Sequence, residues 1–197
     1  MKRRDKHGGL DRWPAATAVL VILTFAPLCS AAAGDVAYHL IRKPGVYTLV
    51  NLHPDEQRRR LYSVNYQQAG LMPLCTPVMI QSVTTKHMTF EVIAIKRIYE
   101  YIFHNSLQEA IDKHLDKFFG TTCDPERVEH LNPFDQDGVK QGRVRTGMTK
   151  EGVILAIGYP PEHATPGLQS NAWQYWKNRF GTMVVHFAHG KVVRVQD

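Results

Sequence analysis

Two cysteines, Cys75 and Cys123, are the residues whose type and separation most directly suggest chemistry in this chain. In an oxidising compartment an even number of cysteines usually forms disulfides, and a bond between these two would close a loop of about 50 residues. The alternative is two separate thiols, because the sequence alone does not give the distance between their Cα atoms. A free thiol paired with a distant histidine would then be a candidate nucleophile.

The histidines of the chain do not form a recognisable metal-binding motif. His186 and His189 lie close in sequence, but the sequence indicates no third ligand. His114 falls in the apolar stripe of a predicted helix, where a buried, hydrogen-bonded histidine is a commoner role than a metal ligand. The segment Asp135–Gly138 superficially matches the start of a calcium-binding loop, but the ligands expected further along are missing. We therefore predict no metal site.

Catalytic signatures do not occur in this sequence. It has no H-E-x-x-H, no G-x-S-x-G, no phosphate-binding glycine loop and no C-x-x-C pair. We therefore predict that the protein is not an enzyme, with no catalytic or cofactor-binding residues and no cofactor. The alternative is a cell-envelope hydrolase or thiol enzyme with a site in the β-rich half.

Residues 1–33 have the pattern of a secretory signal peptide. A basic region precedes the apolar stretch Ala15–Leu28, and the small residues Ser30–Ala33 follow it. The apolar stretch is about 14 residues, shorter than the roughly 20 that a membrane-spanning helix needs. We predict cleavage between Ala33 and Gly34, and an exported protein that is periplasmic or associated with the outer membrane.

A lipid-modified N-terminus at Cys29 is a second possibility for the leader. Signal peptidases for lipoproteins require small residues before the cysteine, whereas the bulky Leu28 and the stiff Pro27 stand there. The site is therefore a poor one, and lipidation would tether the protein to a membrane leaflet.

The charge of the chain is concentrated in the leader. Removing five basic and two acidic residues with the leader lowers the formal net charge from +6 to +3. This mild positive charge permits contact with anionic lipid headgroups or cell-wall glycan. The only dense basic cluster is Arg58–Arg60, which we interpret as a solvated face, so nucleic acid is excluded as a partner.

Residues 34–122 are predicted to form a β-rich domain. Alternation of apolar and polar residues at period two predicts half-buried antiparallel strands, which would suit a small barrel or sandwich of SH3-like type. The five segments rich in β-branched and aromatic residues are Tyr47–Val50, Leu61–Tyr66, Val78–Thr84, Met88–Ile95 and Ile98–Phe103.

The β-rich domain is predicted to end in a packing helix over residues 106–119. Ser106 and Glu109 have the spacing of a capping box, apolar residues repeat at helical spacing, and Gly120 supplies a stop. We interpret the polar residues 123–141 as a connection, in which Asp124 could start a short helix.

Residues 142–197 carry the most informative set of short motifs. Thr149 is a good N-cap for a helix that ends at Gly158, and the prolines after it prevent the helix from continuing. Three strands are then predicted, at Ala172–Asn178, Thr182–Ala188 and Lys191–Gln196, with a two-residue turn at His189-Gly190.

This layout resembles the SmpA/OmlA (BamE-like) family of envelope proteins. The motifs that carry the resemblance are Gly147-Met148-Thr149, Ile157-Gly158-Tyr159-Pro160, Trp173-Gln174-Tyr175 and Gly190-Lys191-Val192. The resemblance implies an α+β chain that ends in a two-helix, three-stranded antiparallel module, whose first helix would be Asp137–Arg143. It also implies a non-catalytic role in binding envelope or outer-membrane proteins, with phosphatidylglycerol as a lipid that such proteins contact.

The aromatic residues of the last region divide between core and surface. Trp173 and Tyr175 share one strand face, which we expect to cover the core together with Met183, Val185 and Phe187. Trp176 takes the other face. The candidate binding surface is formed by Tyr159, Trp176, Lys177 and Arg179, because an exposed aromatic ring beside cations is a natural anchor for a partner.

Overall fold

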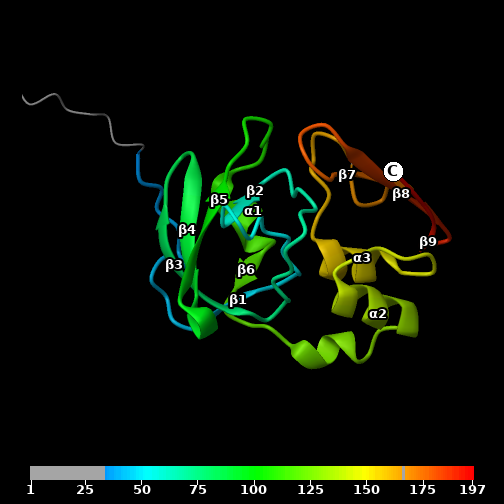
Figure 1. The fold of residues 1–197 in the computed structure, drawn as a ribbon, viewed down its shortest axis with the longest axis horizontal. Coiled ribbons are helices and arrows are strands. Elements are labelled where there is room, and N and C mark those ends of the chain that lie inside the picture. The colour runs from blue at the N-terminus through cyan, green and yellow to red at the C-terminus, as the bar shows by residue number, and fades with distance from the viewer. Residues whose placement is uncertain (1–33, 166) are drawn as a thin grey trace, which may run out of the picture. The chain divides into compact units, whose positions relative to one another are not determined.

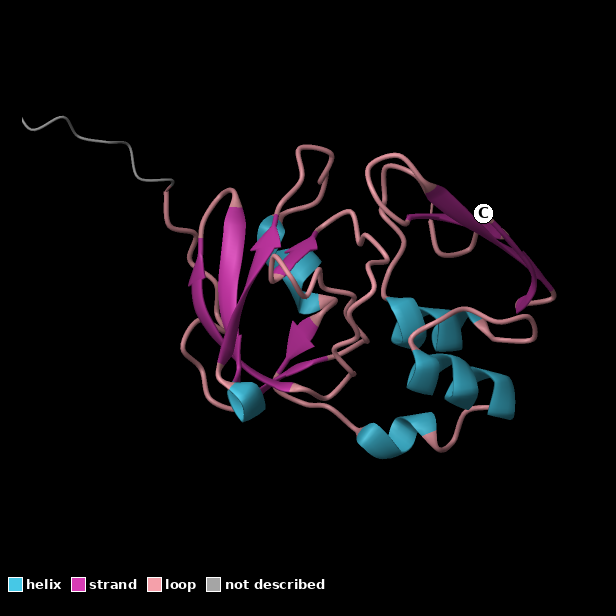
Figure 2. Ribbon diagram, viewed as in Figure 1, coloured by secondary structure: helices cyan, strands magenta, loops and turns pink. Residues whose placement is uncertain are grey.

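The computed structural model describes residues 34–165 and 167–197, which belong to one compact unit (Figure 1). The predicted leader, with Cys29 and Ala33, lies outside these residues. Within them the chain is α+β, with a curled six-stranded sheet, a three-stranded sheet and three α-helices (Figure 2). No helix in this part of the chain is long and apolar enough to span a membrane.

The six-stranded sheet has the order β2-β5-β4-β3-β1-β6. Parallel pairing joins β2 to β5, and the other neighbours are antiparallel. The strands are β1 (Val46–Thr48), β2 (Arg60–Tyr62), β3 (Pro77–Val83), β4 (His87–Val92), β5 (Arg97–Ile102) and β6 (Phe119–Gly120).

Period-two alternation correctly predicts which faces of β4 and β5 are buried. Met88 and Phe90 on β4, and Tyr99 and Tyr101 on β5, are all buried in the core. The rings of Phe90 and Tyr99 stack with their centroids 5.8 Å apart across the two strands. The predicted strand Met88–Ile95 is nevertheless too long, since β4 ends at Val92.

The predicted helix over residues 106–119 is wrong in its bounds and in its cap. The helix α1 spans only Ile111–Asp116, and its N-cap residue makes no side-chain hydrogen bond. The Ser106 hydroxyl instead bonds the ring of His104, and Glu109 bonds His114. Phe119 and Gly120, which were expected to close the helix, form β6 and pair with β1. The rings of Phe118 and Phe119 are both buried, and this burial outweighs the helical periodicity.

Residues 123–141 contain more structure than a connection. A 3-10 helix, η2 (Pro125–Val128), begins after Asp124 as predicted, since the Asp124 carboxylate accepts a hydrogen bond from the Glu126 N–H. The helix α2 spans Pro133–Gln141, and not Asp137–Arg143 as predicted. It starts early because the Asn132 side chain caps its first turn.

The C-terminal region follows the predicted order of elements. The helix α3 (Lys150–Ile157) begins at the N-cap Thr149 and ends at Gly158, where φ is +78°. The strands β7 (Ala172–Trp176), β8 (Thr182–Ala188) and β9 (Lys191–Gln196) form an antiparallel sheet, in that order. Figure 1 shows α2 and α3 side by side near this sheet.

The inner face of the three-stranded sheet carries the predicted core residues. Trp173, Tyr175, Val185 and Phe187 are buried, while Met183 is only partly so. The turn at His189-Gly190 has positive φ at both residues, 50° and 74°, as a two-residue hairpin requires.

Buried polar side chains join the C-terminal helices to the first region. The Asn51 Nδ2 group donates to the carbonyls of Val139 in α2 and Ala156 in α3, at 2.7 and 3.2 Å. The Asn65 Nδ2 group donates to the Ile157 carbonyl at 2.7 Å. The last carbonyls of a helix have no partner within the helix, so these amides satisfy α3 and fix its position.

Candidate binding surface

Trp176 lies where the two sheets of the molecule approach each other. Its carbonyl accepts a hydrogen bond from the Gln67 N–H at 2.8 Å, and it forms a parallel bridge with Tyr66. Its ring is half-buried and stacks on the ring of His163, with centroids 6.4 Å apart. The position of Trp176 is therefore fixed on both sides by chain segments distant in sequence.

Two tyrosines from the first region extend the aromatic area around Trp176. Tyr62, at the end of β2, and Tyr66 have ring centroids 5.0 Å apart. Burial raises the pKa of the Tyr66 phenol, Tyr62 raises it further, and the positive charge of Arg179 opposes them. Tyr66 is joined to β7 through its backbone bridge to Trp176, three residues before Arg179.

The turn between β7 and β8 presents an exposed aromatic ring. Phe180 is 81% exposed, the highest value among the large apolar residues that the structure describes. The guanidinium carbon of Arg179 lies 4.4 Å from the centre of the Phe180 ring. The Asn178 Oδ1 atom accepts hydrogen bonds from the N–H groups of Phe180 and Gly181, which holds the turn in shape. Lys177 pairs with the Asp197 carboxylate at 2.9 Å.

We define the aromatic surface as the residues that these ring contacts and backbone contacts bring together. Its members come from β2, the segment after it, the segment after α3, the end of β7 and the β7–β8 turn. They are Tyr62, Tyr66, His163, Trp176, Arg179 and Phe180.

The structure brings together three of the four residues predicted for the binding surface. Trp176, Lys177 and Arg179 lie at the end of β7 and in its turn. Tyr159 is separate: its ring packs edge-on against Phe118, with centroids 5.8 Å apart. It lines a different feature, a cleft of about 590 Å³ between the disulfide and α3.

Comparisons with protein-family models, with curated proteins and with solved structures found no match. Any functional conclusion therefore rests on the residues and geometry of this chain.

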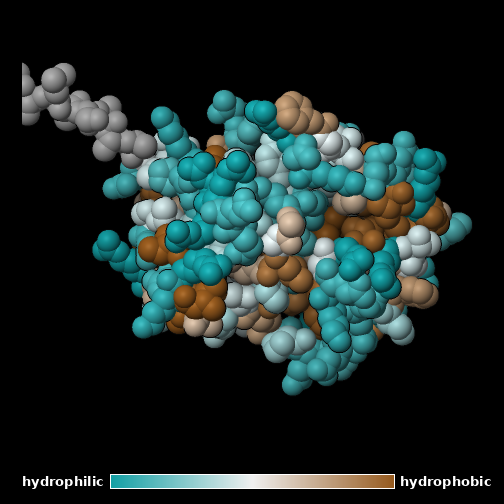
Figure 3. Space-filling model, viewed as in Figure 1, coloured by the Kyte–Doolittle hydropathy of each residue, from teal (hydrophilic) through white to brown (hydrophobic). Residues whose placement is uncertain are grey.

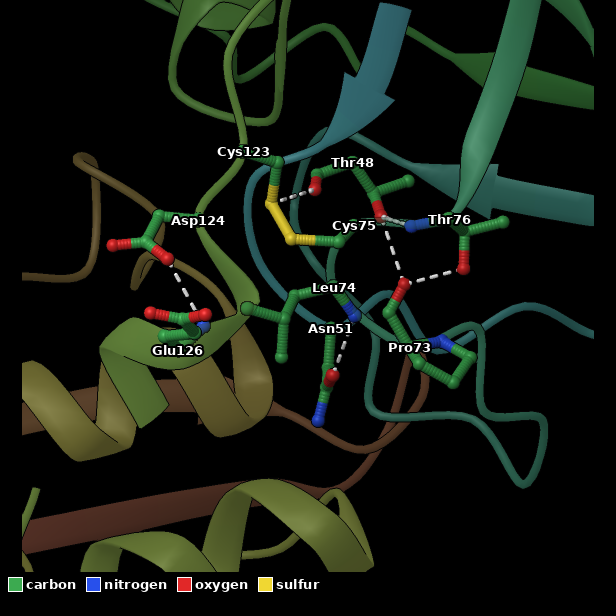
Figure 4. The surroundings of a disulfide bond; sticks show 9 residues. All are labelled: Thr48, Asn51, Pro73, Leu74, Cys75, Thr76, Cys123, Asp124 and Glu126. Carbon is green, nitrogen blue, oxygen red and sulfur yellow. Dashed lines mark hydrogen bonds between the residues drawn. A yellow bond between two sulfur atoms is a disulfide. The ribbon is translucent and has the colours of Figure 1, made fainter. Parts of the chain in front are cut away.

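The predicted disulfide between Cys75 and Cys123 is confirmed, with Cα atoms 5.5 Å apart (Figure 4). It links the loop before β3 to the segment after β6. Both sulfurs are bonded, so neither cysteine is a free thiol that could act as the nucleophile of a thiol enzyme. The Thr48 carbonyl accepts a hydrogen bond from the Cys75 N–H at 2.7 Å, so the loop is also tied to β1.

A buried polar chain runs through His114. The Tyr101 hydroxyl lies 2.8 Å from His114 Nε2, and Glu109 Oε1 lies 2.8 Å from Nδ1. Because an ionised carboxylate only accepts, Nδ1 carries the proton and the tyrosine donates to Nε2. Both ring nitrogens are thus engaged. The predicted role of His114 as a buried, hydrogen-bonded histidine is confirmed.

For both His114 and Glu109, burial and hydrogen bonding shift the pKa in opposite directions. Burial lowers the pKa of His114, and hydrogen bonding to Glu109 opposes this. Burial alone would raise the pKa of Glu109, but hydrogen bonds from Lys117 and His114 hold it below its usual value. Lys117 also pairs with Glu162 at 2.8 Å. This series of polar contacts therefore ends in the segment after α3. These contacts hold the segment after α3 against the residues around α1.

Potential metal ligands do not cluster within residues 34–165 and 167–197. No group of three or more histidine, cysteine, aspartate or glutamate side chains there could hold a metal ion. Asp135, considered as part of a calcium loop, is instead buried and accepts hydrogen bonds from the N–H and hydroxyl of Thr149, at 2.7 and 2.8 Å.

The sequence predicts only Trp176 and Arg179 among the six residues of the aromatic surface. Tyr62 and Tyr66 were assigned to one strand, and their contact with the β7–β8 turn has no local signal. Phe180 falls between the predicted strands Ala172–Asn178 and Thr182–Ala188 and is not among the predicted surface residues. The signal that could have indicated an exposed ring is the position of Phe180 between Arg179 and Gly181, because turns lie at the surface and seldom bury an aromatic ring.

Proposed function

We propose that the protein is a non-catalytic, exported envelope protein that binds another envelope protein through the aromatic surface. The observation that carries this proposal is the 81% exposed ring of Phe180, backed by Arg179 and by the fixed ring of Trp176. Large apolar rings are normally buried, so an exposed one beside aromatic neighbours marks an interaction site.

The composition of the surface suits a protein partner. Tryptophan, tyrosine and arginine are the residues that most often dominate binding energy at interfaces. Trp176 and the Asn178-bonded turn are held by backbone hydrogen bonds, so binding would require little additional ordering.

The layout of the C-terminal region supports a family assignment within this proposal. Two helices, α2 and α3, precede a three-stranded antiparallel sheet, and the motifs Gly147-Met148-Thr149 and Gly190-Lys191-Val192 lie side by side at its β9 edge, where Thr149 bridges Lys191. We infer that this region is a BamE-like module and that the protein acts in outer-membrane protein assembly or envelope integrity. Export by the predicted signal peptide belongs to the same proposal.

Site-specific photo-cross-linking in intact cells tests the proposed surface. Phe180 is replaced by the photoreactive amino acid p-benzoylphenylalanine in the full-length chain, and Phe134 is replaced in a matched control. Phe134 is 57% exposed and lies on α2, so it presents a comparable ring on another element. Adducts are identified by mass spectrometry, and the N-terminus of the protein is determined from the same cells.

We expect one discrete protein adduct from position 180, none from position 134, and an N-terminus at Gly34. Adducts of equal yield from both positions would contradict a specific surface. Recovery of no protein, or of cell-wall glycan alone, would contradict a protein partner. An N-terminus at Met1 would contradict processing of the leader.

A further inference from the structure

The segment Ile93–Ile98, which joins β4 to β5 and includes the first two residues of β5, exposes three isoleucines on a single short corner. Ile93, Ile95 and Ile98 are 45%, 57% and 46% exposed, and the intervening residues are exposed as well. In Figure 3 apolar brown surface lies at the lower left, where Figure 1 shows the helical turn between β4 and β5. We call this segment the isoleucine corner.

Ile93 and Ile95 are exposed because they lie in the turn beyond the last paired residue of β4. Val92 is the last residue of β4, and Ile93–Ile95 form the 3-10 helix η1. The Lys96 N–H donates to the Ile93 carbonyl, and Lys96 has a φ of +49°, which turns the chain into β5. Ile93 and Ile95 therefore leave the alternation that would have buried every second residue, whereas Ile98 follows it and lies on the face of β5 opposite the buried Tyr99.

A shallow groove of about 300 Å³ continues the apolar surface from Ile95. Leu71, Met72 and Val92 line it together with Ile95. Leu71 is exposed as well, so Ile95 and Leu71 border one apolar area drawn from two loops.

The acidic groups near the corner are already engaged. Glu56 Oε2 pairs with Arg97 at 3.1 Å and accepts the Tyr99 hydroxyl at 2.9 Å. Glu100 pairs with Arg60 at 2.8 Å, and Asp55 pairs with Arg58 at 2.9 Å. Glu91 is the fourth acidic side chain and lies opposite Ile98 in the β4–β5 pair. Its carboxylate accepts a hydrogen bond from the side-chain amide of Gln81.

The cations beside the corner include two without an acidic partner among the described residues. These are Lys96 and Arg59. Lys96 lies within the corner, and Arg59 lies beside β5, because its carbonyl accepts a hydrogen bond from the N–H of Glu100 in β5. The corner and its neighbours thus offer positive charge and apolar area to a binding partner. Among the four acidic side chains named above, only Glu91 is not paired with a cation.

We propose that the isoleucine corner inserts into the interface of a lipid bilayer that carries anionic headgroups. Isoleucine side chains have no polar atoms and gain free energy from apolar contact alone, which acyl chains supply. Lys96 and Arg59 would face the headgroup phosphates. This surface is distinct from the aromatic surface and lies outside residues 142–197, so it goes beyond the proposed function.

Vesicle co-sedimentation tests the insertion. Residues 34–197, which belong to one compact unit, are used so that the apolar leader does not bind lipid itself. The probes are vesicles of phosphatidylglycerol with phosphatidylcholine, and vesicles of phosphatidylcholine alone. The variant Ile95→Asp is compared with Val193→Asp, because Val193 on β9 is 52% exposed and provides a matched apolar position.

We expect Ile95→Asp to weaken binding to the phosphatidylglycerol vesicles about tenfold, and Val193→Asp to leave it unchanged. Lys96→Glu should weaken it about fivefold, whereas Lys140→Glu, on the exposed side of α2, should not. Melting curves check that every variant is folded.

Three results would overturn the proposal. They are no binding of the wild type to phosphatidylglycerol vesicles, equal binding by Ile95→Asp and the wild type, and equal losses from Ile95→Asp and Val193→Asp. None of these bears on cross-linking at Phe180, so the two proposals fail separately. A corner that binds a protein instead of lipid would give the first result.

Discussion

The six-stranded sheet and the C-terminal region share one apolar core, but the C-terminal helices are fixed by a second kind of contact as well. In the sheet, apolar residues at alternate positions of β3, β4 and β5 meet in one core. In the C-terminal region, the helices are fixed by buried polar groups such as Asp135, Asn51 and Asn65. The first kind of contact tolerates exchange of apolar side chains of similar volume, whereas the second requires particular atoms at particular places.

The difference matters because the aromatic surface needs both regions. Tyr62 and Tyr66 come from the sheet side, while Trp176 and Phe180 come from the C-terminal side. The buried amides of Asn51 and Asn65 hold the two sides in register, so the polar contacts are those on which the proposed function depends.

The largest effect is expected from opening the sheet core. Phe90 is fully buried, so Phe90→Ala should lower the free energy of unfolding by about 4 kcal/mol. Denaturant titration measures the change. The exposed Ile95 provides the control, since Ile95→Ala should change it by less than about 0.5 kcal/mol. Equal costs at both positions would show that the sheet is not held by its apolar core.

The next effect tests the end of α3, where the two regions meet. A Cβ atom at Gly158 would lie 2.8 Å from Asn65 Nδ2, and its φ of +78° is unfavourable for a branched residue. Gly158→Val should therefore cost about 3 kcal/mol. Gly181→Val is the control, because the nearest atoms to a Cβ there are 3.8 Å away. If Gly158→Val had the same thermal stability as the wild type, Gly158 would not be needed to end α3.

A smaller effect distinguishes a polar contact from mere volume. Asp135→Asn keeps the size of the side chain but replaces an acceptor of the Thr149 hydrogen bonds with a donor, which should cost about 2 kcal/mol. The control Asp137→Asn alters a partly exposed ion pair with Arg145 and should cost about 0.5 kcal/mol. A cost below that of the control would mean that volume, and not hydrogen bonding, holds α2 to α3.

The smallest effect concerns pH. Burial lowers the pKa of His53 and of His114 below the ordinary value of 6.5, so the unfolded chain takes up protons that the folded one does not. Their contribution to stability is complete above that value and is lost as the pH falls through the folded pKa. We expect a lower free energy of unfolding at about pH 5.5 than at about pH 8.

The matched variants for this pH effect are His53→Gln and His130→Gln. His130 is exposed, so its replacement should leave the pH dependence unchanged, whereas His53→Gln should reduce it. The same pH dependence in both variants would show that His53 does not contribute.

Local patterns predicted the elements better than the contacts between them. The faces of β4 and β5, the cap at Thr149 and the stop at Gly158 follow from spacing and side-chain type alone. The strand prediction is wrong for Ile93–Ile95, because hydropathy does not reveal that pairing of β4 ends at Val92, and it is right for Ile98, which lies in β5.

The remaining features depend on partners far along the chain. Asn65 bonds a carbonyl 92 residues away, and no local pattern indicates such a contact. Phe119 was predicted as helical because its spacing fits, yet pairing with β1 determines its conformation. The candidate site could therefore be predicted only for the residues that share one turn, Trp176 to Arg179.

The most direct test of the account compares two positions on the aromatic surface that are distant in sequence. Tyr62 and Phe180 are replaced, in separate full-length chains, by p-benzoylphenylalanine, and the adducts formed in intact cells are identified. The account predicts that both positions capture the same envelope protein. Capture of different proteins, or capture from only one of the two positions, would contradict a single binding surface built by both regions.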